Sequence, residues 1–153
     1  MDEIDKKILK IIQKNATIPL SELSKRVGIS STPCWNRVKK MEENGVITSR
    51  ITLLDNKKIN LPLIIILDVS VKSHKEDWIA QFTNAVMKYD EIIEVHRIAN
   101  ANVDYILKVV APSIEEYDKF QQKLIKEFEF TKMSSSICLK TIKQNYQLPL
   151  HHL

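Results

Sequence analysis

An α+β fold made of two domains is predicted by the pattern of apolar residues along the chain. Over the first third, apolar residues recur every three or four positions, as in amphipathic helices. From residue 61 onward, short runs of branched residues alternate with two longer helical patterns in the order βαββαβ. We therefore divide the sequence into a helical domain over 1–54, a linker over 55–60, an α/β domain over 61–145 and a tail over 146–153.

Three short helices are predicted in the first domain. The first, over about 2–15, has isoleucines on one face. The second follows Pro19 and ends at Gly28. The third begins after Ser30, whose hydroxyl is suited to cap its first turn, and ends at Gly45.

The two glycines of the chain, Gly28 and Gly45, stand at the two points where a helix-turn-helix followed by a wing needs a residue that tolerates positive φ. After Gly45, branched and polar residues alternate on either side of Ser49-Arg50, and we expect a two-stranded hairpin over 46–55. The first domain is therefore predicted to be a winged helix-turn-helix.

Basic side chains are concentrated in this first domain. Residues 1–54 hold ten Lys and Arg against six Asp and Glu, whereas residues 55–153 hold thirteen of each, so the first third carries the whole net charge of +4. Between Ser24 and Lys40 there are five basic residues and no acidic one. Cations beside small polar side chains suit a phosphate backbone with base edges next to it.

The third helix is the predicted DNA-contacting element. Side chains near the start of such a helix reach the major groove, where Asn pairs with adenine, and Lys or Arg with guanine or phosphate. Two alternatives stay open: an ordinary solvated basic face, and a Trp35 that packs on the first helix or the wing. The predicted DNA-binding residues are Lys25, Ser31, Thr32, Trp35, Asn36, Arg37, Lys39 and Lys40.

The second domain is predicted to be a ferredoxin-like α/β sandwich, in which two helices cover one face of a four-stranded antiparallel sheet. The strands look apolar on both faces, so we expect a second copy of the chain to cover the open face in a homodimer. The expected strands span 63–71, 92–98, 105–110 and 133–142, and the expected helices span 75–89 and 113–128.

No catalytic residue, metal site or cofactor is predicted. Cys34 and Cys138 lie far apart and in no metal-ligand spacing, and Cys34 falls on the apolar stripe of the third helix. Paired carboxylates, a glycine-rich phosphate loop and triad spacing are all missing from the sequence. The longest apolar run, 61–67, is too short to span a membrane, and the charged start lacks the apolar core of a signal peptide. We expect a cytoplasmic protein.

Two stretches, MDEIDKKIL and LSKRVGISSTPCWNRVKKMEENGVI, resemble the opening helix and the helix-turn-helix signature of the leucine-responsive regulatory protein/AsnC (feast/famine) family of transcription regulators. The second half follows the order of that family's effector and oligomerisation domain. The resemblance implies a sequence-specific regulator that binds double-stranded DNA as a homodimer, often assembles further into octamers or similar discs, and binds small effectors, usually amino acids, between dimers. A largely sequence-indifferent architectural DNA-binding protein without an effector is the alternative.

The resemblance also implies an effector site beside the loop before the third strand. Where the family commonly shows a Gly-Asp pair, this chain has Ala101-Asn102, and its last strand carries serines where the family often has threonines. A free amino acid, another small molecule and no effector all remain open. The implied effector-binding residues are Ala101, Asn102, Asp104, Ser134 and Ser136.

Overall fold

The computed structural model spans residues 1–153 and describes all of them except 73–74. The chain divides into two compact units. Residues 1–53 together with 143–153 form the first, which we call the helical unit, and residues 54–142 form the second, the sheet unit. Within the part of the chain that is described, no helix is both long and apolar enough to cross a membrane.

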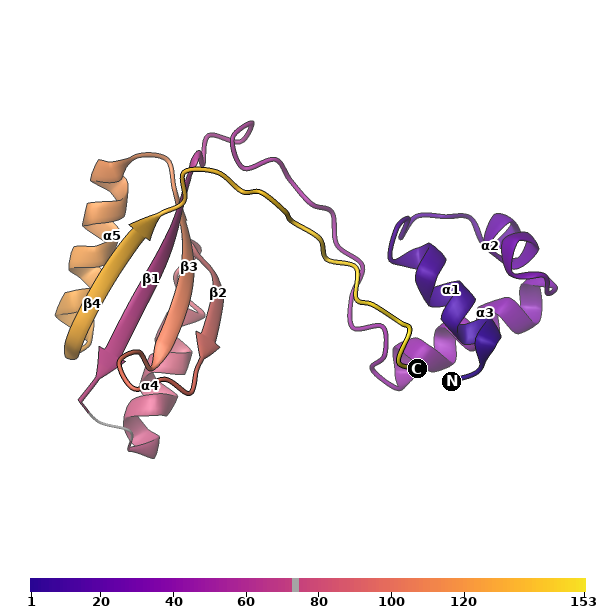
Figure 1. Cartoon of the computed structure of the whole chain (residues 1–153), viewed down its shortest axis with the longest axis horizontal. Helices are drawn as coiled ribbons and strands as arrows, with labels where there is room; N and C mark the ends of the chain where they lie inside the picture. Colours follow the sequence, from indigo (N-terminus) through magenta and orange to yellow (C-terminus); the bar gives the residue numbers. More distant parts are fainter. Residues whose placement is uncertain (73–74) are drawn as a thin grey trace. The chain divides into compact units, whose positions relative to one another are not determined.

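The helical unit contains three short helices, α1 (Glu3–Ile12), α2 (Leu20–Val27) and α3 (Ser31–Glu43) (Figure 1). The carboxylate of Asp2 accepts hydrogen bonds from the first turn of α1 and completes a capping box with Asp5. Apolar side chains from all three helices form one core. It consists of Ile8, Leu9, Ile18, Leu23, Val27, Cys34, Val38 and Met41.

The turn between α2 and α3 depends on Gly28, which has a φ of 80°. A Cβ at this position would meet no described atom within 4 Å, so the requirement for glycine is conformational rather than steric. Ser30 stands at the N-cap of α3, but its hydroxyl makes no capping hydrogen bond to the described residues. The predicted hydroxyl cap is therefore wrong, although the predicted start of the helix is confirmed.

The described residues 46–55 form no β-strand, although their alternation predicts a two-stranded hairpin. Neither Ser49 nor Arg50 adopts the positive φ that tight hairpin turns need. Arg50 instead pairs with Glu42 on α3, with 2.9 Å between Nη2 and Oε1. A two-stranded ribbon without further strands is only marginally stable, and this segment accordingly lacks a ladder.

The sheet unit has the predicted βαββαβ order, with its four strands all antiparallel and arranged β2-β3-β1-β4. Both helices lie on the same side of the sheet (Figure 1). The ferredoxin-like α/β sandwich is thus confirmed. Its elements are β1 (Leu63–Val71), α4 (Glu76–Val86), β2 (Ile92–Arg97), β3 (Tyr105–Ala111), α5 (Ile114–Glu127) and β4 (Phe130–Ile137).

The core of the sheet unit lies between the sheet and its helices. Phe82 of α4 is fully buried, with its ring 5.0 Å from the ring of Tyr105 and 5.4 Å from that of Phe128. Neither α4 nor α5 lies over the other side of the sheet, which we call the open face. It carries partly buried isoleucines, Ile64, Ile66 and Ile106, among polar side chains.

β4 begins and ends earlier than the predicted range of 133–142. At the end of β4, Ile137 pairs with Ile65 of β1. The backbone N–H of Cys138 then donates to the carbonyl of Ile64 at 2.8 Å. Because β1 begins at Leu63, the residues after Cys138 have no strand to pair with. The apolar residues after Cys138 favour a continued strand in the sequence. In the structure, β4 ends where its neighbour β1 begins.

Candidate nucleic-acid interface

One face of α3 gathers most of the predicted DNA contacts. The apolar stripe of the helix is buried in the core of the helical unit, so the residues between its members point outward. Lys25 is exposed on α2, and the Ser31 hydroxyl lies 3.2 Å from that of Ser24, joining the start of α3 to α2. The exposed predicted residues of α3 are Ser31, Thr32, Trp35, Asn36, Lys39 and Lys40.

Trp35 is exposed beside a lysine of the same helix. Its side chain is 49% exposed, and the Nζ of Lys39 lies 5.0 Å from the centre of its ring, in cation–π range. The ring also borders a cavity of about 390 Å³ whose apolar wall includes Ile12 of α1 and Leu23 of α2. Trp35 thus lies exposed at the rim of this cavity, where a partner can reach it.

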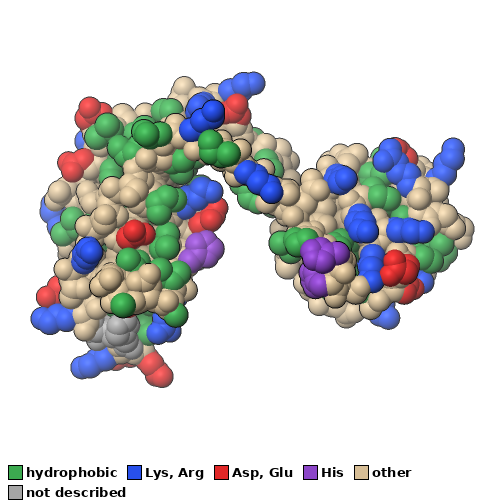
Figure 2. All heavy atoms as spheres, viewed as in Figure 1, with side chains coloured by type: hydrophobic (Ala, Val, Ile, Leu, Met, Phe, Trp, Pro, Cys, Tyr) green, Lys and Arg blue, Asp and Glu red, His purple; other side chains and the backbone are tan. Residues whose placement is uncertain are grey.

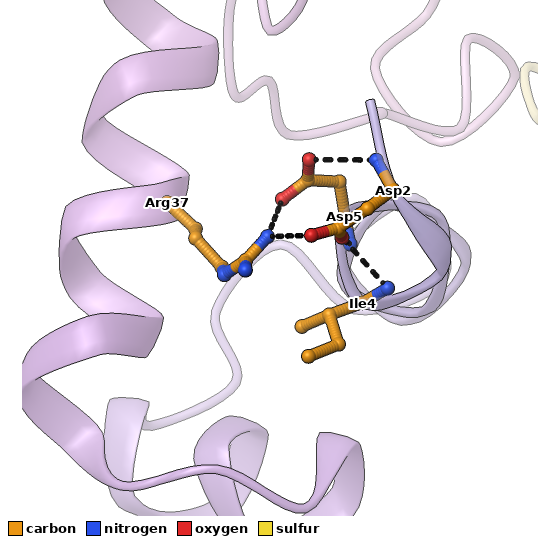
Figure 3. A network of polar contacts seen from close by, with 4 residues as sticks. All are labelled: Asp2, Ile4, Asp5 and Arg37. Atoms are coloured by element: carbon orange, nitrogen blue, oxygen red, sulfur yellow. Dashed lines mark hydrogen bonds and ion pairs between the residues drawn. The ribbon is translucent and has the colours of Figure 1, made fainter.

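Arg37 points toward α1 (Figure 3). Its Nη1 lies 2.6 Å from Asp2 Oδ2 and 2.8 Å from Asp5 Oδ1. The hydrogen bonds that Arg37 donates to Asp5 and Asp2 raise the pKa of Arg37, while the backbone N–H of Asp5 and the guanidinium of Arg37 lower the pKa of Asp2. The bridge therefore holds α3 against the first turn of α1.

This bridge is a structural feature that the sequence did not predict, because Arg37 was expected only as a basic residue of the DNA-binding face. A signal was present in the acidic first turn of α1, which carries Asp5 after the capping Asp2. Even so, on the face in view in Figure 2, the blue Lys and Arg side chains of the helical unit outnumber the red acidic ones. The basic character expected of a DNA-binding unit is retained without Arg37.

The loop between β2 and β3, which holds Ala101 and Asn102, is fastened to the end of β1. The hydroxyl of Ser70 donates to the backbone carbonyl of Asn102 at 2.6 Å. The backbone N–H of Val71 donates to Asp104 Oδ2 at 2.8 Å. Ala101 and Asn102 themselves are exposed, whereas Asp104 is partly buried and uses its carboxylate to hold the loop in place.

Ser134 and Ser136 are exposed on the open face of β4. In the ladder, Ser70 lies opposite Lys132, so Ser134 is two residues further along β4, or about 7 Å, and Ser136 about 13 Å. Ser134 therefore lies near the middle of β4, closer than Ser136 to the end of the open face where Asn102 is held. Ser70 was missed by sequence reasoning: strand alternation predicts its face, but nothing local predicts its bond to the loop.

A separate cavity of about 580 Å³ lies between α4 and β2, where Val95, Arg97 and Tyr105 are among its lining residues. The hydroxyl of Tyr105 is buried and makes no hydrogen bond within the described part of the chain. None of the residues implied for effector binding lines this cavity. The sheet unit therefore has a second hollow, apart from the residues implied for effector binding.

Taken together, the fold and these sites define a class of protein: a helix-turn-helix DNA-binding unit joined in one chain to an α/β unit with room for a small ligand. Residues 1–48 match the family model for winged helix-turn-helix DNA-binding, and residues 64–148 match that of the Lrp/AsnC ligand binding domain. The chain belongs to the Lrp/AsnC family of transcription regulators.

Known relatives resemble the chain over its full length. The HTH-type transcriptional regulator Zrp of Zymomonas mobilis is 40% identical over 153 residues, which cover 100% of this chain and 99% of Zrp. The crystal structure of an AsnC family regulator from Agrobacterium tumefaciens has a TM-score of 0.94 at 39% identity, covering 100% of this chain and 99% of that one. A regulator from Neisseria meningitidis, solved as a complex with L-methionine, has a TM-score of 0.92 at 30% identity, covering 99% and 98%.

Proposed function

We propose that this chain regulates transcription by reading DNA with the exposed face of α3. The observation that carries the proposal is the placement of Asn36, Lys39 and Lys40 on one exposed face, while Arg37, at the edge of that face, holds the helix to α1. In a dimer, two such helices enter successive major grooves about 34 Å apart on a pseudo-palindromic site. DNA is the macromolecular partner, and the cytoplasm is where the protein acts.

The same proposal includes a homodimer formed through the sheet unit. Ile64, Ile66 and Ile106 on the open face are only partly buried within one chain, and a second copy placed on this face would cover them. Further assembly of dimers into an octamer or a similar disc follows the pattern implied by the family. The protein has no catalytic role in this account.

The proposed effector is a free amino acid bound beside Asn102 and Ser134. The complex of the Neisseria relative with L-methionine supports this class of ligand. An Asn side chain offers both an acceptor for an ammonium group and a donor for a carboxylate, so Asn102 provides contacts for either charged end of an amino acid. Because the carboxylate of Asp104 holds the loop, its contribution is to position Asn102.

Binding to DNA from upstream of the protein's own gene, compared with scrambled DNA at about 150 mM salt, tests the regulator against the architectural alternative. A regulator should favour its site by ~10³ or more, whereas a ratio below about tenfold supports an architectural protein. Repeating the titration with each of the twenty amino acids tests the effector. If none of them changes the affinity for DNA, the amino-acid part of the proposal is wrong.

The position of the effector is tested by calorimetric titration of variants with the amino acid that acts. Asn102→Ala and Ser134→Ala should each weaken binding by roughly tenfold, because each removes a polar contact to a charged group. Tyr105→Phe is the control, since it removes only the unpaired hydroxyl of the cavity between α4 and β2. Loss of binding in Tyr105→Phe alone would place the ligand in that cavity.

A further inference from the structure

The segment from Tyr146 to Leu153 packs on the helical unit. Just past the end of α1, the side-chain amide of Gln13 pairs with the backbone of Leu148 in the way a peptide group would. Its Oε1 accepts the N–H of Leu148 at 2.7 Å, and its Nε2 donates to the carbonyl of Leu148 at 3.4 Å. This pair fixes the register of the segment against α1.

Leu150 provides the apolar part of the same contact. Its side chain is partly buried and packs against the core of the helical unit, whereas that of Leu148, two residues earlier, is 72% exposed. The segment, α1 and residues 46–50 together line a cavity of about 410 Å³. The segment is therefore held at two points, one polar and one apolar.

The docked segment lies beyond a second covalent connection between the units and holds one end of α1. The chain leaves the helical unit after Leu53 and rejoins it at Lys143, so two covalent connections join the helical and sheet units. The docked segment contacts the C-terminal end of α1, and the first turn of α1 holds Arg37 of α3. A helix fixed at both ends restrains α3 better than one fixed at its N-terminus alone.

We propose that the end of α1 and residues 46–50 form a docking site for the chain's own segment Tyr146–Leu153, and that docking holds α1, and through it α3, in the DNA-binding arrangement. The occupant is the chain's own segment, because residues 143–153 form one compact unit with residues 1–53, in which Leu148 bonds to Gln13 and Leu150 packs on the core. The docking itself is independent of the proposed function, and only its effect on DNA affinity depends on that function.

Hydrogen exchange on the full-length protein tests the docking. Leu150→Ala should speed amide exchange in α1 by roughly tenfold and leave the sheet unit unchanged, because it removes the apolar anchor without touching β4. Leu148→Ala is the matched control, since its exposed side chain contributes little packing. Gln13→Leu, which keeps an apolar body but removes both hydrogen bonds, should give an intermediate increase. Exchange in α1 that stays at the unaltered rate in both Leu150→Ala and Gln13→Leu would overturn the proposal.

Crosslinking decides whose segment occupies the site. Ala16→Cys and Leu148→Cys, which line the same cavity and leave Gln13 and Leu150 in place, are combined in a Cys138→Ser background, in which the remaining Cys34 is buried, and treated with a short bismaleimide. A monomeric crosslinked product is expected on a denaturing gel. A crosslinked dimer would assign the site to a second copy, and no crosslink at all would show that the segment is not docked; either result overturns the proposal.

DNA affinity tests the consequence for α3. The Leu150→Ala variant should lose affinity for the target DNA and for scrambled DNA to the same extent, by roughly fivefold. A loosened α3 no longer holds its contacts to the DNA backbone in place on either sequence. An unchanged affinity would contradict the role in holding α3. If instead the unaltered chain binds no DNA, the proposed function fails, while the exchange and crosslinking results still decide whether the segment docks.

Discussion

Arg37 of α3 and Asp5 of α1 form a partly buried ion pair, with 2.8 Å between Nη1 and Oδ1. The same nitrogen lies 2.6 Å from a carboxylate oxygen of Asp2 (Figure 3). A cation in the middle of the predicted DNA-binding helix is thus paired with carboxylates of the helical unit. The pair makes the position of α3 depend on the N-terminus of α1.

Breaking this pair from either side should act in the same direction. Arg37→Leu, which removes the bonds to both carboxylates, should lower the melting temperature and weaken binding to target and scrambled DNA alike, by roughly fivefold. Asp5→Asn, which leaves the bond to Asp2, should have the same effects to a smaller extent. The double variant should be no worse than Arg37→Leu alone, since the interaction can be lost only once. Thermal unfolding and DNA titrations of the three variants provide the measurement.

A direct phosphate contact by Arg37 would give a different pattern. In that case Arg37→Leu would reduce the slope of log affinity against log salt by about 1, while Asp5→Asn would leave DNA binding unimpaired. Lys40→Ala is the reference for such a contact, because Lys40 is exposed on the same helix. That pattern would contradict the bridging role.

The capping carboxylate of Asp2 makes the stability of the helical unit depend on pH. The Asp5 backbone N–H and Arg37 lower the pKa of Asp2 in the folded state, so its stabilising effect is complete above the unfolded value of about 4 and is lost as the pH falls through the lowered folded value. Asp2→Asn keeps a capping side chain but removes the charge. It should lower the melting temperature at pH 7, and the difference from the unaltered chain should shrink below about pH 4. A difference that does not change between pH 7 and pH 3 would contradict this.

The sequence predicts the parts of the site that depend on local periodicity. Spacing along α3 separates the buried Cys34 and Val38 from the exposed Asn36 and Lys40, and each glycine stands where the chain turns. Strand alternation likewise places Ser134 on the open face. These features are fixed by neighbouring residues, which a single sequence displays directly.

Features that join distant residues are not predicted. Nothing near Arg37 shows that its partner is Asp5, 32 positions earlier, and nothing near Leu148 points to Gln13, 135 positions earlier. The hairpin over 46–55 is the converse case, because alternation alone predicts it although the described residues form no ladder there. Whether two segments pair depends on the free energy of their contacts in the folded chain. That free energy depends on which distant residues the fold places next to them.

Asp104 should stabilise the sheet unit by holding the loop between β2 and β3 to the end of β1. Because its Oδ2 accepts the N–H of Val71 at 2.8 Å, Asp104→Ala leaves that N–H without the acceptor and should cost about 1–2 kcal/mol of unfolding free energy. Asp104→Asn retains an acceptor and should cost less. Denaturant unfolding monitored on the sheet unit measures both variants. Unchanged stability in Asp104→Ala would show that the loop is held by other contacts.

The most direct test of the account compares Asn36→Ala with Lys40→Ala in a binding-site selection, with affinities measured over a range of salt. If the exposed face of α3 reads DNA, Asn36→Ala should lose the preference for one base pair, at about 1–3 kcal/mol. Lys40→Ala should instead weaken binding to all sequences and lower the salt slope by about 1. If neither variant changes the selected sequences, the affinity or the salt slope, α3 is not the reading helix and the central claim is wrong.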